Sequence, residues 1–120
     1  LLPLTTLFAA HKTVQRTAVV LPPLPGPWQA LAGVAAAVYE IHHGQTRVRA
    51  DMVAGGAAVV EATPGLLWHS PDGQVLGCYW HGLFENPAVV QALWGRAAPS
   101  LDTVFARMAQ GVERWFSPLP

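Results

Sequence analysis

The chain has 120 residues, enough for one domain or for part of a larger one. It contains 7 Lys and Arg residues against 7 Asp and Glu residues, so it carries no net charge, and no basic stripe points to nucleic acid. The sequence contains no run of about 18 apolar residues, so it predicts no membrane span. A single cysteine cannot form an internal disulfide, which favours a reducing, cytoplasmic location.

The composition is strongly apolar, with 52% hydrophobic and 12% charged residues, whereas ordinary soluble domains carry about 25% charge. Either another domain or partner covers part of the surface, or the bias reflects an alanine-rich composition; both explanations stay open. The first twelve residues are apolar, but they lack a basic start and contain Pro3, so they make a poor signal peptide. Because the chain does not begin with methionine, we expect it to be cut from a longer protein.

The first half of the chain predicts strands and loops. Residues 13–21 are rich in Thr and Val and predict a β-strand, whereas the prolines of 22–27 exclude regular structure. Residues 33–42 predict a second strand that ends at Gly44. We expect residues 45–65 to be irregular or to contain short strands.

A turn signal, "SPDG", occupies residues 70–73. Pro71 fixes its own φ, and Gly73 can adopt the left-handed conformation. The flanking segments, 66–69 and 74–80, therefore predict a β-hairpin.

Two helices are predicted in the last third of the chain. Asn86 is a good N-cap for a helix that continues to Trp94 and stops at Gly95. A second helix is expected to start at Ser100 and to end at Pro118. Its apolar residues recur with helical spacing, which predicts that one face packs onto a sheet: Leu101, Val104, Phe105, Met108, Val112, Trp115 and Phe116. Strands followed by helices indicate an α/β or α+β architecture.

The segment "GCYWHGLFEN", residues 77–86, contains the side chains of a thiol hydrolase: cysteine, histidine and glutamate. His81 would end a strand, where active sites of α/β sheets lie, and histidine is the natural proton shuttle near neutral pH; the alternative is a structural histidine bonded to backbone. Cys78 lies in a strand at an odd spacing from His81, so the two side chains would face opposite sides. We interpret Cys78 as a buried packing residue.

Three other polar residues are candidates for this site. Glu85 either lies beside His81 and orients it, or is a solvated carboxylate before the N-cap. Alternation places Glu40 and His42 on one strand face, where they could line a common site. They could also bind a metal with His69, but metal sites usually need three or four ligands, and we predict no metal site here.

Three segments, in this order, resemble the glutamine amidotransferase domain of the cobyric acid synthase family. They are "LLPLTT" followed by Lys12 and Thr13, "YEIHHGQT" at 39–46, and "DGQVLGCYWHGLFEN" at 72–86. The resemblance spans nearly the whole chain and covers the C-terminal part of that domain. It implies an α/β fold, namely part of a flavodoxin-like class I amidotransferase domain with a hairpin at about 66–80 and two C-terminal helices.

The resemblance also implies a function. In this family a cysteine attacks the carboxamide of glutamine, and the ammonia passes to a synthetase domain that uses ATP and Mg to amidate carboxylates of the corrin ring, converting adenosylcobyrinic acid a,c-diamide to cobyric acid in cobalamin biosynthesis. His81 matches the family histidine, which acts as general base and then as general acid. The nucleophile would precede Leu1, and the synthetase domain would also be absent, so residues 1–120 alone are expected to hold no cofactor and to be inactive.

Departures from the family pattern leave the partner of His81 open. Cys78 stands where the family commonly has threonine, and Glu85 stands where it has aspartate. Classical class I enzymes place an acidic residue two positions after the histidine, where this chain has Leu83. Glu85, Glu40 or neither of them would then orient His81.

Two other functions remain as alternatives. A non-catalytic interaction module would explain the low charge through a docking surface, and a related amidotransferase would act on a cell-wall precursor. If the first strands of the domain are missing, an unpaired sheet edge invites pairing with another chain, so we expect a homodimer or strand exchange.

Overall fold

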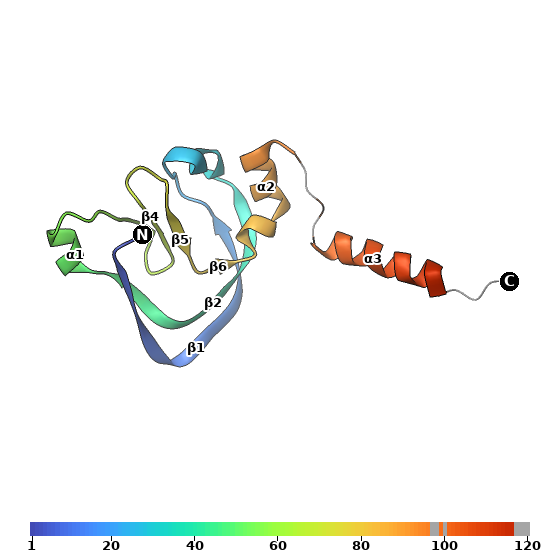
Figure 1. Ribbon diagram of the computed structural model, residues 1–120, viewed down its shortest axis with the longest axis horizontal. Coiled ribbons are helices and arrows are strands. Elements are labelled where there is room, and N and C mark those ends of the chain that lie inside the picture. The colour runs from blue at the N-terminus through green and yellow to red at the C-terminus, as the bar shows by residue number, and fades with distance from the viewer. Residues whose placement is uncertain (97–98, 100, 117–120) are drawn as a thin grey trace.

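The computed structural model describes residues 1–96, 99 and 101–116 (Figure 1). The strands form two three-stranded sheets in which all the described pairs are antiparallel. Sheet A has the order β1-β2-β6, and sheet B has the order β3-β4-β5. The strands are β1 (Leu4–Val20), β2 (Ala35–Val48), β3 (Val60–Thr63), β4 (Leu67–His69), β5 (Leu76–Cys78) and β6 (Trp80–His81).

Helices connect and follow these strands. They are the 3-10 helices η1 (Gly26–Leu31) and η2 (Leu83–Glu85) and the α-helices α1 (Ala50–Ala54), α2 (Pro87–Trp94) and α3 (Leu101–Phe116). The expected α/β class with two C-terminal helices is confirmed. The side chain of Asn86 caps α2 by accepting a hydrogen bond from the backbone N–H of Ala88 at 3.0 Å, and Gly95 ends this helix in the left-handed conformation, as predicted.

The first two strands are longer than the sequence predicted. β1 includes residues 13–20 of the expected strand but begins at Leu4, and β2 continues through Gly44 to Val48. The expectation that Gly44 ends the strand was therefore wrong. A Cβ atom at Gly44 would lie 2.6 Å from the carbonyl oxygen of Leu7, so glycine is needed here for close approach of two strands. Within 45–65, the short strand β3 was expected and the helix α1 was not.

The predicted hairpin is confirmed, with one correction. β4 pairs with β5, and Gly73 adopts φ +72° in the connecting turn. The expected strand 74–80 is nevertheless divided, because the chain leaves sheet B after Cys78 and enters sheet A at Trp80. This change of sheet brings the segment that contains His81 next to β2.

The hydrophobic core joins both sheets to the helices η1, η2 and α2, and α3 lies outside it. It lies on the side of β2 that carries Val38, and Trp80 and Leu83 enter it from either side of His81. Its buried members are Leu21, Leu24, Leu31, Ala36, Val38, Leu67, Trp80, Leu83 and Val89. Two of the residues nearest to His81 in the sequence are therefore anchored by packing.

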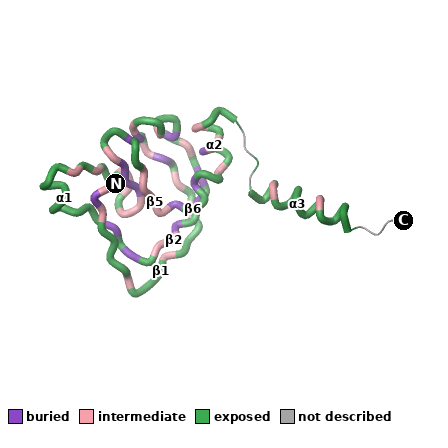
Figure 2. Tube along the Cα trace, in the orientation of Figure 1, coloured by how far each residue is buried: buried purple, intermediate pink, exposed green. Residues whose placement is uncertain are grey.

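α3 forms as predicted, but the expectation that its apolar face packs onto a sheet was wrong. Figures 1 and 2 show α3 pointing away from both sheets, with an exposed surface. Phe105 is 60% exposed and Trp115 is 88% exposed. Periodicity indicates which side chains share a face of a helix, but it does not indicate what that face contacts. The predicted ends of this helix, Ser100 and Pro118, lie outside the described residues.

None of the helices in the described ranges is long and apolar enough to cross a membrane.

The anchoring of the loop after His81 can be tested with Leu83→Ala. Because Leu83 is 1% exposed, the substitution should lower the free energy of unfolding by about 2–5 kcal/mol. Leu7→Ala is the matched control, since Leu7 is 62% exposed and should cost less than about 1 kcal/mol. Urea unfolding followed by circular dichroism measures both values, and equal losses would contradict this description of the core.

Candidate active site

His81 lies at the end of β6, on the exposed side of sheet A. Its Nε2 atom is 3.1 Å from the carbonyl oxygen of Ile41 in β2. A carbonyl oxygen only accepts, so Nε2 must carry the hydrogen, and Nδ1 of the neutral ring keeps its lone pair. Among the described residues no hydrogen bond occupies Nδ1. The ring is thus held at one nitrogen and can accept a proton at the other.

His81 lines a hollow of about 350 Å³. Arg16 pairs with Tyr39 across β1 and β2, and Tyr39 pairs with His81 across β2 and β6, so these three side chains form a row on one face of sheet A. The guanidinium carbon of Arg16 is 6.0 Å from the centre of the Tyr39 ring. Arg16 and Tyr39 have no local sequence signal that points to this site, because only the strand register places them in a row with His81.

The chain turns sharply after His81 and brings Glu85 into the same hollow. Gly82 adopts φ +78°, a conformation that favours glycine, and a Cβ there would meet nothing within 4 Å. η2 follows, and both Glu85 and Asp102 of α3 line the hollow. In the described part of the chain no hydrogen bond or ion pair joins Glu85 to His81. Glu85 therefore lines the same hollow as His81 without bonding its ring.

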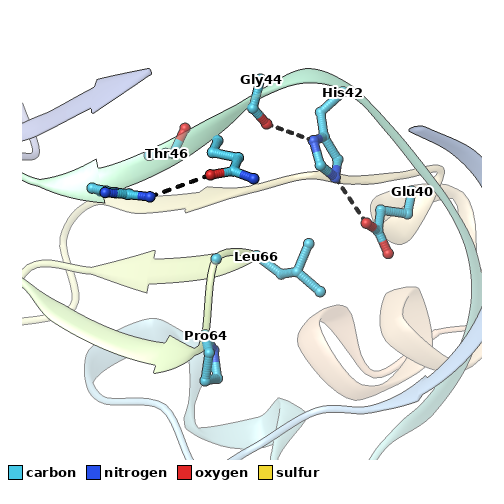
Figure 3. A pocket seen from close by; sticks show the side chains of 9 residues that line it. Glu40, His42, Gly44, Thr46, Pro64 and Leu66 are labelled. Carbon is cyan, nitrogen blue, oxygen red and sulfur yellow. Dashed lines mark hydrogen bonds and ion pairs between the residues drawn. The ribbon is translucent and has the colours of Figure 1, made fainter. Parts of the chain in front are cut away.

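Glu40 and His42 lie on the opposite face of β2. Glu40 pairs with the buried Trp80, and its carboxylate accepts a hydrogen bond from Gln15 Nε2 at 2.8 Å. Its other oxygen is 2.8 Å from Nε2 of His42 (Figure 3). The predicted shared face of Glu40 and His42 is confirmed, but this pair and His81 are on different sides of the sheet.

The Glu40–His42 pair lines a second hollow, of about 380 Å³, between β2 and the Pro64–Gly65–Leu66 turn. The hydrogen bonds from Gln15 and His42 lower the pKa of Glu40, and burial opposes them only in part. His69, the third candidate ligand, lies in sheet B, where its Nδ1 donates to the carbonyl of Ser70 at 2.7 Å. Among the described residues no group of three His, Cys, Asp or Glu side chains could hold a metal ion.

Cys78 lies in β5 of sheet B, whereas His81 lies in sheet A. The cysteine is half-buried and lines a different, smaller hollow with Thr6 and Tyr79. Burial raises the pKa of the Cys78 thiol, which disfavours the reactive thiolate. The geometry therefore offers no local pairing of Cys78 with His81.

Comparison with known proteins assigns most of the chain to one family. The profile of the CobB/CobQ-like glutamine amidotransferase domain matches residues 1–89. The chain belongs to this family. It is 52% identical over 118 residues to the cobyric acid synthase of Acidovorax ebreus (strain TPSY) and 49% identical over 118 residues to that of Paracidovorax citrulli (strain AAC00-1).

The amidotransferase match extends over nearly the whole chain but over a small part of its relatives. The chain is also 48% identical to the cobyric acid synthase of Polaromonas sp. (strain JS666 / ATCC BAA-500). Each of the three alignments covers 98% of this chain and 24% of the relative. The chain thus spans about a quarter of the length of these relatives. No solved structure matches it.

The carboxylate of Glu40 makes the stability of this amidotransferase segment dependent on pH. Because the folded-state pKa of Glu40 is lowered from its ordinary value of 4.5, the carboxylate stabilises the fold above about pH 4.5. That contribution is lost as the pH falls through the lowered folded value. Urea unfolding of the chain and of Glu40→Gln, from pH 6 to pH 3, should show the wild-type advantage shrinking in acid. An advantage that stays constant or grows in acid would contradict this assignment.

Proposed function

We propose that the chain is the C-terminal part of the glutamine-hydrolysing domain of a cobyric acid synthase, with His81 as its acid–base catalyst. The observation that carries this proposal is the His81 ring, bonded at Nε2 to a backbone carbonyl and left without a hydrogen bond at Nδ1 by the described residues, in a hollow that Arg16 also lines. The names of the relatives support corrin-ring carboxylates as acceptors and give no support to a cell-wall precursor. ATP and Mg would act in a synthetase part outside residues 1–120.

The proposed chemistry needs a thiol that this chain does not supply, since Cys78 lies in the other sheet. His81 Nδ1 takes the proton of a cysteine outside residues 1–120, and the sulfur attacks the side-chain carboxamide carbon of glutamine. The imidazolium then gives its proton to the departing ammonia, which leaves a thioester. His81 then takes a proton from water, whose oxygen attacks the thioester carbon; the C–S bond breaks, glutamate is released, and the proton returns to the cysteine sulfur.

The hollow also suits a free amino acid. Glutamine carries an α-carboxylate and an α-ammonium group, and the hollow is lined by one cationic residue, Arg16, and by two acidic residues, Glu85 and Asp102. Arg16 would hold the α-carboxylate, because its planar donors match carboxylate geometry. Glu85 would hold the α-ammonium group.

His81→Asn tests the catalytic role. Because the chain is a quarter of its relatives in length, the assay uses the Acidovorax ebreus protein with its matching C-terminal segment replaced by this chain. The substitution should lower glutamine-dependent amidation by about 10²–10⁴-fold and leave amidation with added ammonia intact, since only the glutaminase step is lost.

Two controls sharpen the His81 test. His43→Asn changes an exposed histidine that lies outside the His81 hollow, and Cys78→Ser removes the local thiol; both should keep the glutamine-dependent rate. The chain of residues 1–120 alone should release no glutamate from glutamine. Activity of that chain which Cys78→Ser abolishes would overturn the proposal.

Arg16→Met tests the recognition of glutamine. Losing one charge-assisted contact should raise KM for glutamine by about 10–100-fold and change kcat little, because the contact exists in both the ground and transition states. Lys12→Met, on the same strand and outside the hollow, should leave KM unchanged. A fall in kcat at constant KM would instead place Arg16 in the chemical step.

A further inference from the structure

The backbone that holds His81 lies at the end of the short ladder between β2 and β6. β6 pairs with β2 only at Tyr39 and Glu40, so Ile41 is the first residue beyond that ladder. On the other edge of β2, the register with β1 passes from Thr13 opposite His42 to Phe8 opposite Gly44, and the four residues 9–12 face a single residue of β2. Ile41 itself pairs with Val14 of β1, but among the described strands nothing pairs with it on the β6 side, where its carbonyl bonds His81.

Side chains on the opposite face add further links around Ile41. Gln15 of β1 donates to Glu40 at 2.8 Å. Figure 3 shows the other two bonds: His42 bonds Glu40 at 2.8 Å, and Nδ1 of His42 donates to the carbonyl of Gly44 at 2.7 Å. Both ring nitrogens of His42 therefore face oxygen atoms, one on each side of the ring. These bonds link residues 40, 42 and 44 of β2 to one another and to β1, with Ile41 between them.

Packing holds this linkage in place. The His42 ring stacks on Tyr79, with centroids 4.6 Å apart and planes at 26°. The side chains of His42 and Glu40 are only 16% and 12% exposed, so their interaction is weakly screened by solvent. Tyr79 directly precedes Trp80 and His81, which ties the linkage to the strand that carries the catalytic candidate.

We propose that Glu40 and His42 are positioning residues for His81: by pinning β2 on one face, they fix the Ile41 carbonyl that orients the His81 ring on the other face. The inference rests on the proposed function of His81. Neither residue touches His81, so their effect passes through the backbone of Ile41. Fixed orientation of a general base matters because a displacement of about 1 Å can cost about 10²-fold in rate.

The direct test measures the His81 ring in the 120-residue chain by ¹H–¹⁵N NMR of ¹⁵N-labelled histidine. In the wild type, His81 should appear as the Nε2–H tautomer, because Nε2 donates to Ile41. Glu40→Ala should shift His81 towards the tautomer mixture of a free imidazole. Glu40→Gln, which keeps an acceptor for His42, should restore most of the wild-type signal. Gln45→Ala is the control, since Gln45 is exposed on β2 and its side chain accepts a hydrogen bond from Arg47 and not from Glu40 or His42.

His42→Phe provides a second variant in case Glu40→Ala fails to fold. Phenylalanine keeps the stacking on Tyr79 but loses both hydrogen bonds of His42, so the same shift of the His81 signal is expected. Folded variants whose His81 tautomer matches the wild type would overturn the proposal and leave Glu40 and His42 with a purely structural role.

Kinetics in the chimaeric protein separates this inference from the proposed function. Glu40→Ala should lower kcat for glutamine by about 10–100-fold with KM changed less than about 3-fold, and ammonia-dependent amidation should persist. A normal kcat in Glu40→Ala would contradict the positioning role. If His81→Asn keeps its glutamine-dependent rate, the proposed function fails. The NMR experiment would still show whether Glu40 and His42 fix the His81 ring, because it does not depend on activity.

Discussion

The antiparallel pairing of Trp80–His81 with Tyr39–Glu40 is the contact on which the arrangement of this site depends. Strand geometry sends neighbouring side chains to opposite faces, so this short ladder places His81 beside Tyr39 and places Trp80 in the core beside Glu40. One face of β2 thus receives the hollow with the candidate catalyst, and the other receives the polar linkage of Glu40 and His42.

Much of this could be predicted from local sequence signals. The turn at 70–73, the cap at Asn86 and the stop at Gly95 each follow from the conformation that one residue type favours, and all three are confirmed. The interpretation of Cys78 as a packing residue followed from its odd spacing from His81, and the structure adds that the two residues belong to different sheets.

The remaining features depend on contacts between distant segments, which no local pattern contains. Gly44 was predicted to end a strand, but it permits the close approach of β1. The row of Arg16, Tyr39 and His81 needs the register of three strands, and the role of the Ile41 carbonyl has no side-chain signature. Distant contacts also decide which carboxylate could bond His81 directly. Glu40 lies on the opposite face of the sheet, and Glu85 lines the hollow without a bond to the His81 ring.

The central claim is that His81 works with a thiol supplied from outside residues 1–120. The most direct measurement is covalent labelling of the chimaeric protein with an electrophilic glutamine analogue, with the modified residue mapped by mass spectrometry. The account predicts an adduct on a cysteine outside residues 1–120, formed much more slowly in His81→Asn. An adduct on Cys78 would contradict it.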